Sequence, residues 1–157
     1  MPSATFDALY LLRHTSSHFA ASHATVKNIC DWAMFVRTKG NDVDWGFVGH
    51  TVRQSGMEPF VAAMQQIAVE RLGAAAAIPV AKISKTLQQR VENEMTYGEF
   101  GQPSHPQSGW RRAWWKWRRY CANRWKRRLV FRDAESIMLL RGIGSHLKHP
   151  GKITHKH

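Results

Sequence analysis

Apolar residues recur along most of this chain at spacings of three and four, which is the period of an amphipathic α-helix. Alternation with a period of two, typical of half-buried strands, is scarce. The pattern predicts five helices, and their expected bounds are 4–21, 25–38, Asp44 to Gly56, Pro59 to Gly73, and Val80 to Met95. We therefore expect an all-α fold in which residues 1–97 form a compact domain of four to five helices.

Each predicted helix has an apolar or small-residue stripe that we expect to face the core. In chain order the stripes are Leu9, Leu12, Ser16 and Phe19; Val26, Ile29, Ala33 and Val36; Trp45, Val48 and Val52; Phe60, Met64, Ile67 and Leu72; and Val80, Ile83, Leu87, Val91 and Met95. The two cysteines, Cys30 and Cys121, fall within predicted helices without the spacing of a disulfide framework, so we expect buried, reduced thiols.

The last third of the chain is organised differently. Residues 98–109 contain three glycines and two prolines and predict a linker loop. Residues 110–148 predict a basic arm of two helices, the second near 133–147, and residues 149–157 predict a disordered tail.

The segment from Trp110 to Arg132 holds ten Lys/Arg and five of the seven tryptophans, with no acidic residue. One helical stripe contains Trp110, Trp114, Trp117, Cys121 and Trp125. We expect this stripe to pack against the protein, which leaves the off-stripe Trp115 as the candidate for an exposed contact. Nucleic acid and an anionic lipid surface remain open as partners.

Net charge also distinguishes the last third of the chain from the rest. The formal charge of the chain is +12, yet residues 1–100 carry nine Lys/Arg against nine Asp/Glu, so the whole excess lies in residues 101–157. We expect a region this basic to meet phosphates, a lipid surface or an acidic protein, or else to remain solvated. The candidate phosphate-binding residues are Arg111, Arg112, Lys116, Arg118, Arg119 and Lys126. No signal peptide or transmembrane run is evident, so we expect a cytoplasmic protein.

Few residues outside this segment suggest chemistry. His14 and His18 are separated by one helical turn, but two histidines alone are an incomplete metal site, so packing or hydrogen bonding is the better interpretation. Lys27 and Asp31 have the same spacing and predict a surface ion pair. The pair of Asp42 and Asp44 lies at a loop-to-helix junction, where a capping role is favoured over metal binding. We expect no catalytic residue and no metal ligand in this chain.

Several segments resemble a bacterial nucleotidyltransferase family, most of whose members are uncharacterised. They include Phe6 to Phe19 with its HxxxHF end, the CDWAMF stretch from Cys30 to Phe35, and the Trp/Arg segment, and the likeness runs from about Phe6 to Pro150. The chain resembles the helical C-terminal half of that family. The resemblance implies a partner catalytic domain, in cis or in trans, whose Gly-Ser and Asp-x-Asp motifs hold Mg²⁺ and a nucleoside triphosphate. The Gly-Ser of this chain, Gly144-Ser145, falls in a predicted basic helix instead.

The resemblance also implies what the helical half does. It would close over the catalytic site and bind the acceptor, with His14, His18, Lys27 and Asp31 as candidates for the acceptor or nucleotide pocket. Lys27 stands where the family usually has an arginine, so the bidentate guanidinium contact is lost. The expected function is that of an accessory nucleotidyltransferase domain without catalytic residues or bound cofactor. The alternative is a non-enzymatic nucleic-acid-binding module that uses residues 110–132.

Overall fold

The computed structural model describes residues 3–21, 23–98 and 109–131, and every regular element within these ranges is helical. The prediction of an all-α fold is therefore confirmed. The elements are α1 (Ala4–Ala20), α2 (Val26–Lys39), the 3₁₀ turn η1 (Gly40–Asp42), α3 (Trp45–Gln54), α4 (Glu58–Leu72), α5 (Lys85–Tyr97), α6 (Gly109–Ala122) and α7 (Arg124–Val130).

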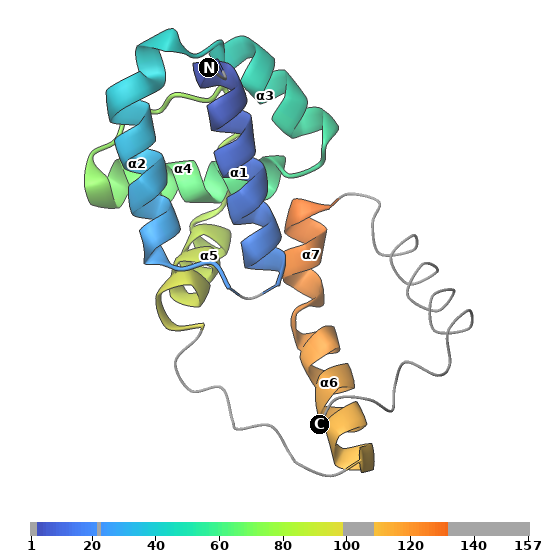
Figure 1. Cartoon of the computed structure of the whole chain (residues 1–157). Coiled ribbons are helices and arrows are strands. Elements are labelled where there is room, and N and C mark those ends of the chain that lie inside the picture. The colour runs from blue at the N-terminus through green and yellow to red at the C-terminus, as the bar shows by residue number, and fades with distance from the viewer. Residues whose placement is uncertain (1–2, 22, 99–108, 132–157) are drawn as a thin grey trace, which may run out of the picture.

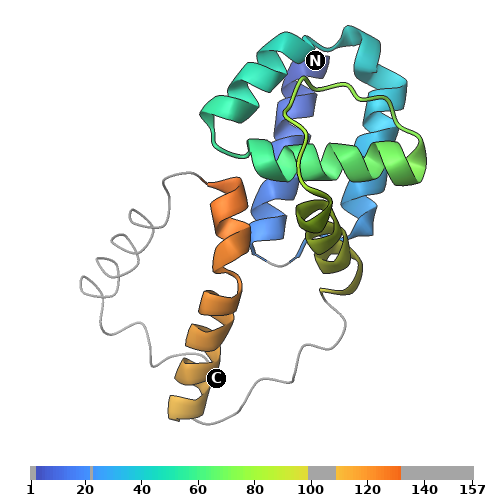
Figure 2. The ribbon, with the colours of Figure 1, turned by 180° about the vertical axis from the view of Figure 1, so that it is seen from behind.

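The first helices form two layers. Helices α1 and α2 lie side by side and antiparallel, and α4 crosses behind both of them (Figure 1). Seen from behind, α4 lies across this pair, with α3 at one end and α5 packed below it (Figure 2). Helix α7 packs against α1 and α4. The outer face of the α1–α2 layer is therefore left uncovered by the described helices.

Aromatic side chains fill the space between the layers. The rings of Phe19 in α1 and Phe60 in α4 have centroids 4.6 Å apart, and both side chains are buried. Trp32 of α2 is buried and meets the ring of Trp45 edge-on at 6.0 Å. The indole Nε1 of Trp45 donates a hydrogen bond of 2.9 Å to the carbonyl of Gly40, which fixes the turn between α2 and α3. These contacts hold α1 against α4 and α2 against the start of α3.

Most predicted core positions are buried, but the ends of two stripes are not. Val26 is 42% exposed and Leu72 is 46% exposed, so the prediction that they face the core is wrong. Val26 is the first residue of α2 and Leu72 the last of α4, where a helix extends beyond the layer that it packs on. The predicted burial of the cysteines is also wrong, since Cys121 is exposed and Cys30 is only half-buried.

The fifth helix begins at Lys85, five residues later than predicted. Ser84 caps it, because its side-chain oxygen accepts a hydrogen bond of 3.2 Å from the backbone N–H of Leu87. The irregular stretch before it is held by Gln65, whose side-chain amide donates to the carbonyl of Ile78 and accepts from its N–H. Pro79 lies so close to Gly49 of α3 that a Cβ there would be 3.0 Å from the proline ring. The stretch is therefore a packed connection.

The basic segment is broken into two helices. Helix α6 ends at Ala122, and α7 begins at Arg124 after Asn123. The α7 part of the predicted arm packs on α1 and α4. Most of the predicted linker (99–108), the predicted helix near 133–147 and the predicted tail (149–157) lie outside the described residues. Across the described parts of the chain, none of the helices has the length and hydropathy to cross a membrane.

Candidate functional site

A row of four rings follows the surface of α1. Tyr10 stacks on His14 with centroids 5.8 Å apart, and His14 meets His18 edge-on at 4.3 Å. His18 in turn faces His23, just beyond the end of the helix, at 6.5 Å. Tyr10 and His14 are exposed, and His18 is half-buried. The three helical rings are one turn apart in sequence, so their spacing follows from the helix itself. We call these four residues the ring row.

The ring row includes two residues that the sequence suggested and two that it did not. His14 and His18 are brought together, as their spacing predicts. Tyr10 lies one further turn back on the same face, a position that the same periodicity could have identified. His23 follows α1, and its approach depends on the turn there, where its N–H bonds the carbonyl of His18 at 2.8 Å. No regular spacing would have identified His23.

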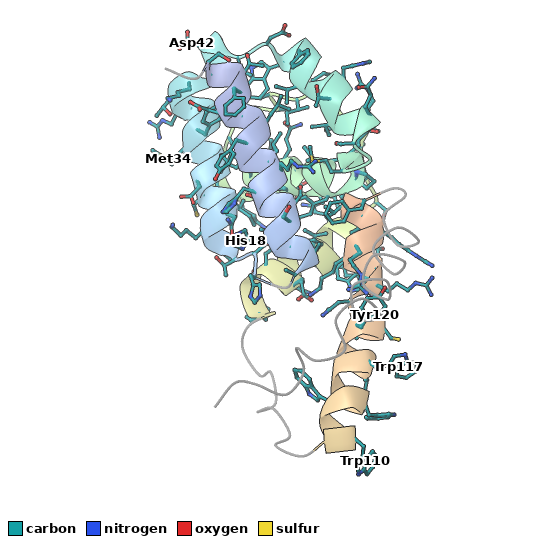
Figure 3. All side chains as sticks on the ribbon, turned by 45° about the vertical axis from the view of Figure 1, so that its right-hand side comes forward. His18, Met34, Asp42, Trp110, Trp117 and Tyr120 are labelled. Atoms are coloured by element: carbon teal, nitrogen blue, oxygen red, sulfur yellow. The ribbon has the colours of Figure 1, made fainter. Side chains whose placement is uncertain are left out.

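Lys27 and Asp31 form the predicted pair on α2, with Nζ and Oδ2 3.8 Å apart. The Lys27 side chain is 83% exposed, so solvent screens the attraction and the pair adds little to stability. Helix α2 begins soon after α1 ends, so this pair and His18 lie at the same end of the α1–α2 layer (Figures 1 and 3). His14 lies one turn further along α1.

Asp44 has the capping role that was favoured for it. Its carboxylate accepts a hydrogen bond of 2.9 Å from the N–H of Phe47 at the start of α3. Asp42 belongs to the preceding 3₁₀ turn. Across the described residues, no three His, Cys, Asp or Glu side chains are grouped as a metal site requires. Because Asp44 caps α3, the Asp42–Asp44 pair does not offer two free carboxylates to a Mg²⁺ ion.

The phosphate-binding candidates fall into different environments. Lys126 is buried, 2% exposed, and is paired with Glu94 of α5. Arg118 is exposed, and its guanidinium lies 5.6 Å from the ring centre of Trp114. The backbones of Arg111, Arg112, Lys116 and Arg119 lie in α6, but their side chains fall outside the described part of the structure. Of the two described side chains, only Arg118 is open to a phosphate.

The predicted packing of the tryptophan stripe is wrong for most of its length. Trp110, Trp114 and Trp117 are 75%, 53% and 63% exposed. Only Trp125, in α7, packs on the protein, where its ring meets Phe19 edge-on at 5.7 Å. The off-stripe Trp115 is half-buried and is not the exposed residue of the set. The stripe is real, but α6 extends beyond the helices that could have covered it (Figure 1).

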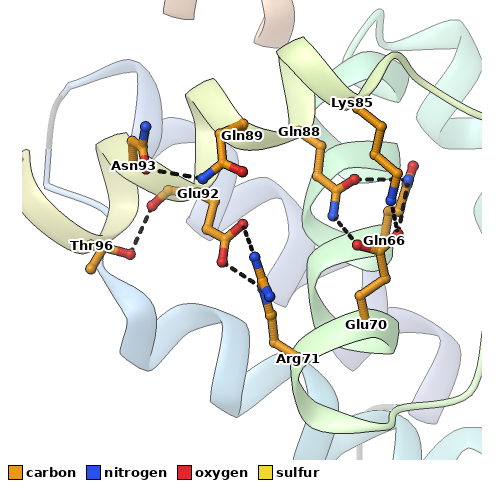
Figure 4. Close-up of polar contacts among 9 residues, drawn as sticks. All are labelled: Gln66, Glu70, Arg71, Lys85, Gln88, Gln89, Glu92, Asn93 and Thr96. Carbon is orange, nitrogen blue, oxygen red and sulfur yellow. Dashed lines mark hydrogen bonds and ion pairs between the residues drawn. The ribbon is translucent and has the colours of Figure 1, made fainter.

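A polar cluster joins α4 to α5 (Figure 4). Glu70 accepts hydrogen bonds from Lys85 and Gln88, each at 2.6 Å, and from Gln66 at 3.3 Å. These donors, Lys85 first, lower the pKa of Glu70 to about 2. Arg71 pairs with Glu92 at 2.7 Å, which raises the arginine pKa. Every carboxylate oxygen here already has a donor, so the cluster is structural.

Fold and site together define a small helical protein that presents a ring row on one surface and a basic, tryptophan-bearing helix on another. Residues 1–73, which span α1 to α4, match the model of a family described as uncharacterised nucleotidyltransferase. The resemblance seen in the sequence is thereby confirmed for this part, just under half of the 157 residues. The chain matches no curated protein and no solved structure. The ring row and the Lys27–Asp31 pair both lie within the matched region.

Proposed function

We propose that this chain is the helical, acceptor-binding part of a nucleotidyltransferase and that the ring row is where the acceptor binds. The observation that carries the proposal is the continuous contact from Tyr10 to His23 on the uncovered face of the α1–α2 layer. Tyr10 and His14 are exposed and take no part in the core, so their rings are accessible to a ligand. The family match over the same residues supplies the reaction class.

The chemistry of these rings suits an acceptor with hydroxyl groups. A neutral imidazole carries one hydrogen-bond donor and one acceptor, so His14 and His18 can each orient a hydroxyl. The ring of Tyr10, 63% exposed, offers a face for stacking and a phenol for hydrogen bonding. Nucleotidyl transfer depends on holding the acceptor oxygen in line with the phosphorus it attacks. Positioning is therefore the role of the ring row.

Lys27 and Asp31 extend this surface along α2. Their ion pair is weak and exposed, so either side chain can turn to a ligand at small cost. Asp31 would accept a hydrogen bond from an acceptor hydroxyl, and Lys27 would neutralise a nearby phosphate. Lysine acts there as a point charge, because it lacks the fork of a guanidinium.

The transfer step itself needs a group that the described residues do not supply. The reaction requires Mg²⁺ to neutralise the triphosphate, and one carboxylate of the Asp42–Asp44 pair, that of Asp44, is engaged in a helix cap. A catalytic domain with Gly-Ser and Asp-x-Asp motifs, in cis or in trans, would hold the metal and the nucleotide. In this proposal the catalytic domain carries out the transfer, and this chain binds the acceptor.

The test is reconstitution. The 157-residue chain is mixed with a catalytic domain of the same family, and transfer of label from α-labelled nucleoside triphosphates to small hydroxyl-bearing acceptors is measured. We expect the mixture to exceed either part alone, and the double variant His14→Ala/His18→Ala to lose the gain while the KM for the triphosphate is unchanged. His50→Ala is the matched control, since His50 is an exposed histidine on α3.

Two results would reject the proposal. Activity of the mixture no greater than that of the catalytic domain would remove the accessory role. A gain that survives the double variant would remove the ring row from it. Circular dichroism of each variant excludes misfolding as the cause, and exposed histidines such as His14 should leave the spectrum unchanged.

A further inference from the structure

Helix α6 presents an exposed aromatic strip. Trp110, Trp114 and Trp117 are spaced four and three residues apart, so they share one side of the helix. Each of them leaves more than half of its surface open to solvent. Tyr120 and Cys121 follow on the next turn and are also exposed. Three large rings in a line form a surface that a protein in water ordinarily covers.

The rest of the molecule holds this strip away from itself. Helix α7 is fixed to the helical layers by Trp125, which packs on Phe19 and lies under the Arg90 guanidinium at 3.9 Å. The buried Lys126, paired with Glu94, adds a second attachment. Helix α6 extends from α7 in the direction that leads away from the other five α-helices (Figure 1). Trp110 and Trp117 lie along this extension (Figure 3). The described part of the strip therefore extends beyond α1 to α5.

Charge restricts what that partner can be. Helix α6 contains five Lys/Arg and no acidic residue, and α7 adds four more. The Arg118 guanidinium lies over the ring of Trp114, 5.6 Å from its centre, so at least one cationic head contacts the aromatic strip. An amphipathic helix with tryptophan on one side and arginine around it is typical of helices that lie in the interface of an anionic lipid bilayer.

The ring contacts favour lipid over nucleic acid. Arg118 lies over one face of Trp114, and Arg127 lies over one face of Tyr120 at 3.7 Å, so each of these rings has one face fewer for a stacked base. A bilayer interface needs no open ring face. It needs apolar rings on one side and cations that reach the lipid phosphates, and side chains such as Arg118 can extend toward the headgroups.

We propose that α6 is a lipid-surface anchor that lies flat on an anionic membrane, with Trp110, Trp114 and Trp117 in the interfacial layer. The arginines and lysine of α6 bind the lipid phosphates, and α7 transmits the attachment to the helical body. The proposal does not depend on acceptor binding, because the ring row is on a different helix and face.

The experiment uses the full 157-residue chain and two sets of vesicles, one of phosphatidylcholine alone and one with added phosphatidylglycerol. Sedimentation gives the bound fraction, and lipids brominated in the acyl chain report by fluorescence quenching whether tryptophan enters the bilayer. We expect binding to the anionic vesicles only, with quenching, and falling affinity as salt is raised.

The decisive variant is Trp110→Ser/Trp114→Ser/Trp117→Ser, which leaves the charge unchanged. We expect it to bind anionic vesicles about tenfold or more weakly and to lose the quenching. The matched control is Phe6→Ser/Phe47→Ser/Tyr97→Ser, which removes three comparably exposed apolar side chains from the helical body. It should bind as the parent does. All six positions are exposed, so both variants should fold, which circular dichroism checks.

Other outcomes overturn the proposal. Equal binding of the tryptophan variant would show attraction by charge alone. Absence of binding to anionic vesicles would exclude a lipid partner. If a short single-stranded RNA binds the chain more tightly than the vesicles do, and loses that affinity in the tryptophan variant, then α6 is a nucleic-acid site.

Discussion

Glu70 shows at the scale of one residue how neighbours can fix an exposed carboxylate. Its three hydrogen-bond donors come from two helices, Gln66 from α4 and both Lys85 and Gln88 from α5 (Figure 4). Because these donors favour the charged form, the pKa falls from an ordinary 4.5 to about 2. The ionised carboxylate therefore stabilises the contact between α4 and α5.

This pKa predicts a pH dependence of stability. A carboxylate whose pKa is lower in the folded protein stabilises it fully above the unfolded value, and that contribution is lost as pH falls from about 4.5 to about 2. Glu70→Gln should therefore be less stable than the parent at neutral pH, and the difference should vanish near pH 2. Urea unfolding across this range measures it. Asp42→Asn is the control, and a pH-independent difference for Glu70→Gln would contradict the prediction.

At the scale of elements, a buried lysine of α7 joins this helix to α5. Lys126 is 2% exposed and its partner Glu94 has a side chain 25% exposed, so the pair lies at the edge of the core. The ammonium also lies 5.9 Å from the ring centre of Phe19. Removing one member of such a pair leaves the other partly desolvated and without its charge partner.

We predict that Lys126→Ala lowers the free energy of unfolding by about 2 kcal/mol, below the range for fully buried pairs because Glu94 reaches solvent. Lys126→Ala/Glu94→Ala should recover part of that loss, since no charge is then left unpaired. Chemical denaturation of the parent, both single variants and the double variant gives the coupling. Strictly additive effects of the two substitutions would mean that the pair contributes nothing.

The helices also differ in how well their bounds could be predicted from the sequence. The first four helices follow from signals within each segment, such as Asp44 as a cap and Gly73 as a stop; Gly73 does adopt the left-handed conformation, with φ of 64°. The start of α5 was misplaced because Val80 and Ile83 keep helical spacing in a stretch that Pro79 and Gln65 hold irregular. The spacing of apolar residues does not distinguish a helix from an irregular stretch that tertiary contacts hold in place, because it reflects the local sequence only.

In the candidate site, too, only the features set by local helix geometry could be predicted from the sequence. The contact between His14 and His18 was predictable, because one helical turn brings them together. The position of His23 was not, because it depends on the turn after α1. The exposure of Trp114 was also beyond the sequence, since a stripe specifies which residues share a side but not whether anything covers it. Acceptor binding by the ring row stays a prediction.

At the scale of the whole molecule, the tryptophans of one helical stripe lie in two different environments. Trp117 in α6 is 63% exposed, whereas Trp125 in α7 is half-buried between Phe19 and Arg90. These contacts connect the end of the described chain to its first and fifth helices. Helix α7 is thus part of the cooperative unit, and α6 is an extension of it.

This division predicts opposite results for the same substitution at two positions of one stripe. Trp125→Ala should lower the free energy of unfolding by about 2 kcal/mol, since it removes a partly buried ring and its contact with Phe19. Trp117→Ala should change it by less than about 0.5 kcal/mol, because an exposed side chain loses little on truncation. Urea unfolding followed by circular dichroism compares them. An equal loss of unfolding free energy in both variants would place α6 within the folded core, and equally small changes would mean that α7 does not belong to it. The expected result is a single unfolding transition in both variants, with lower stability only for Trp125→Ala. That result fits a folded body that includes α7 but not α6.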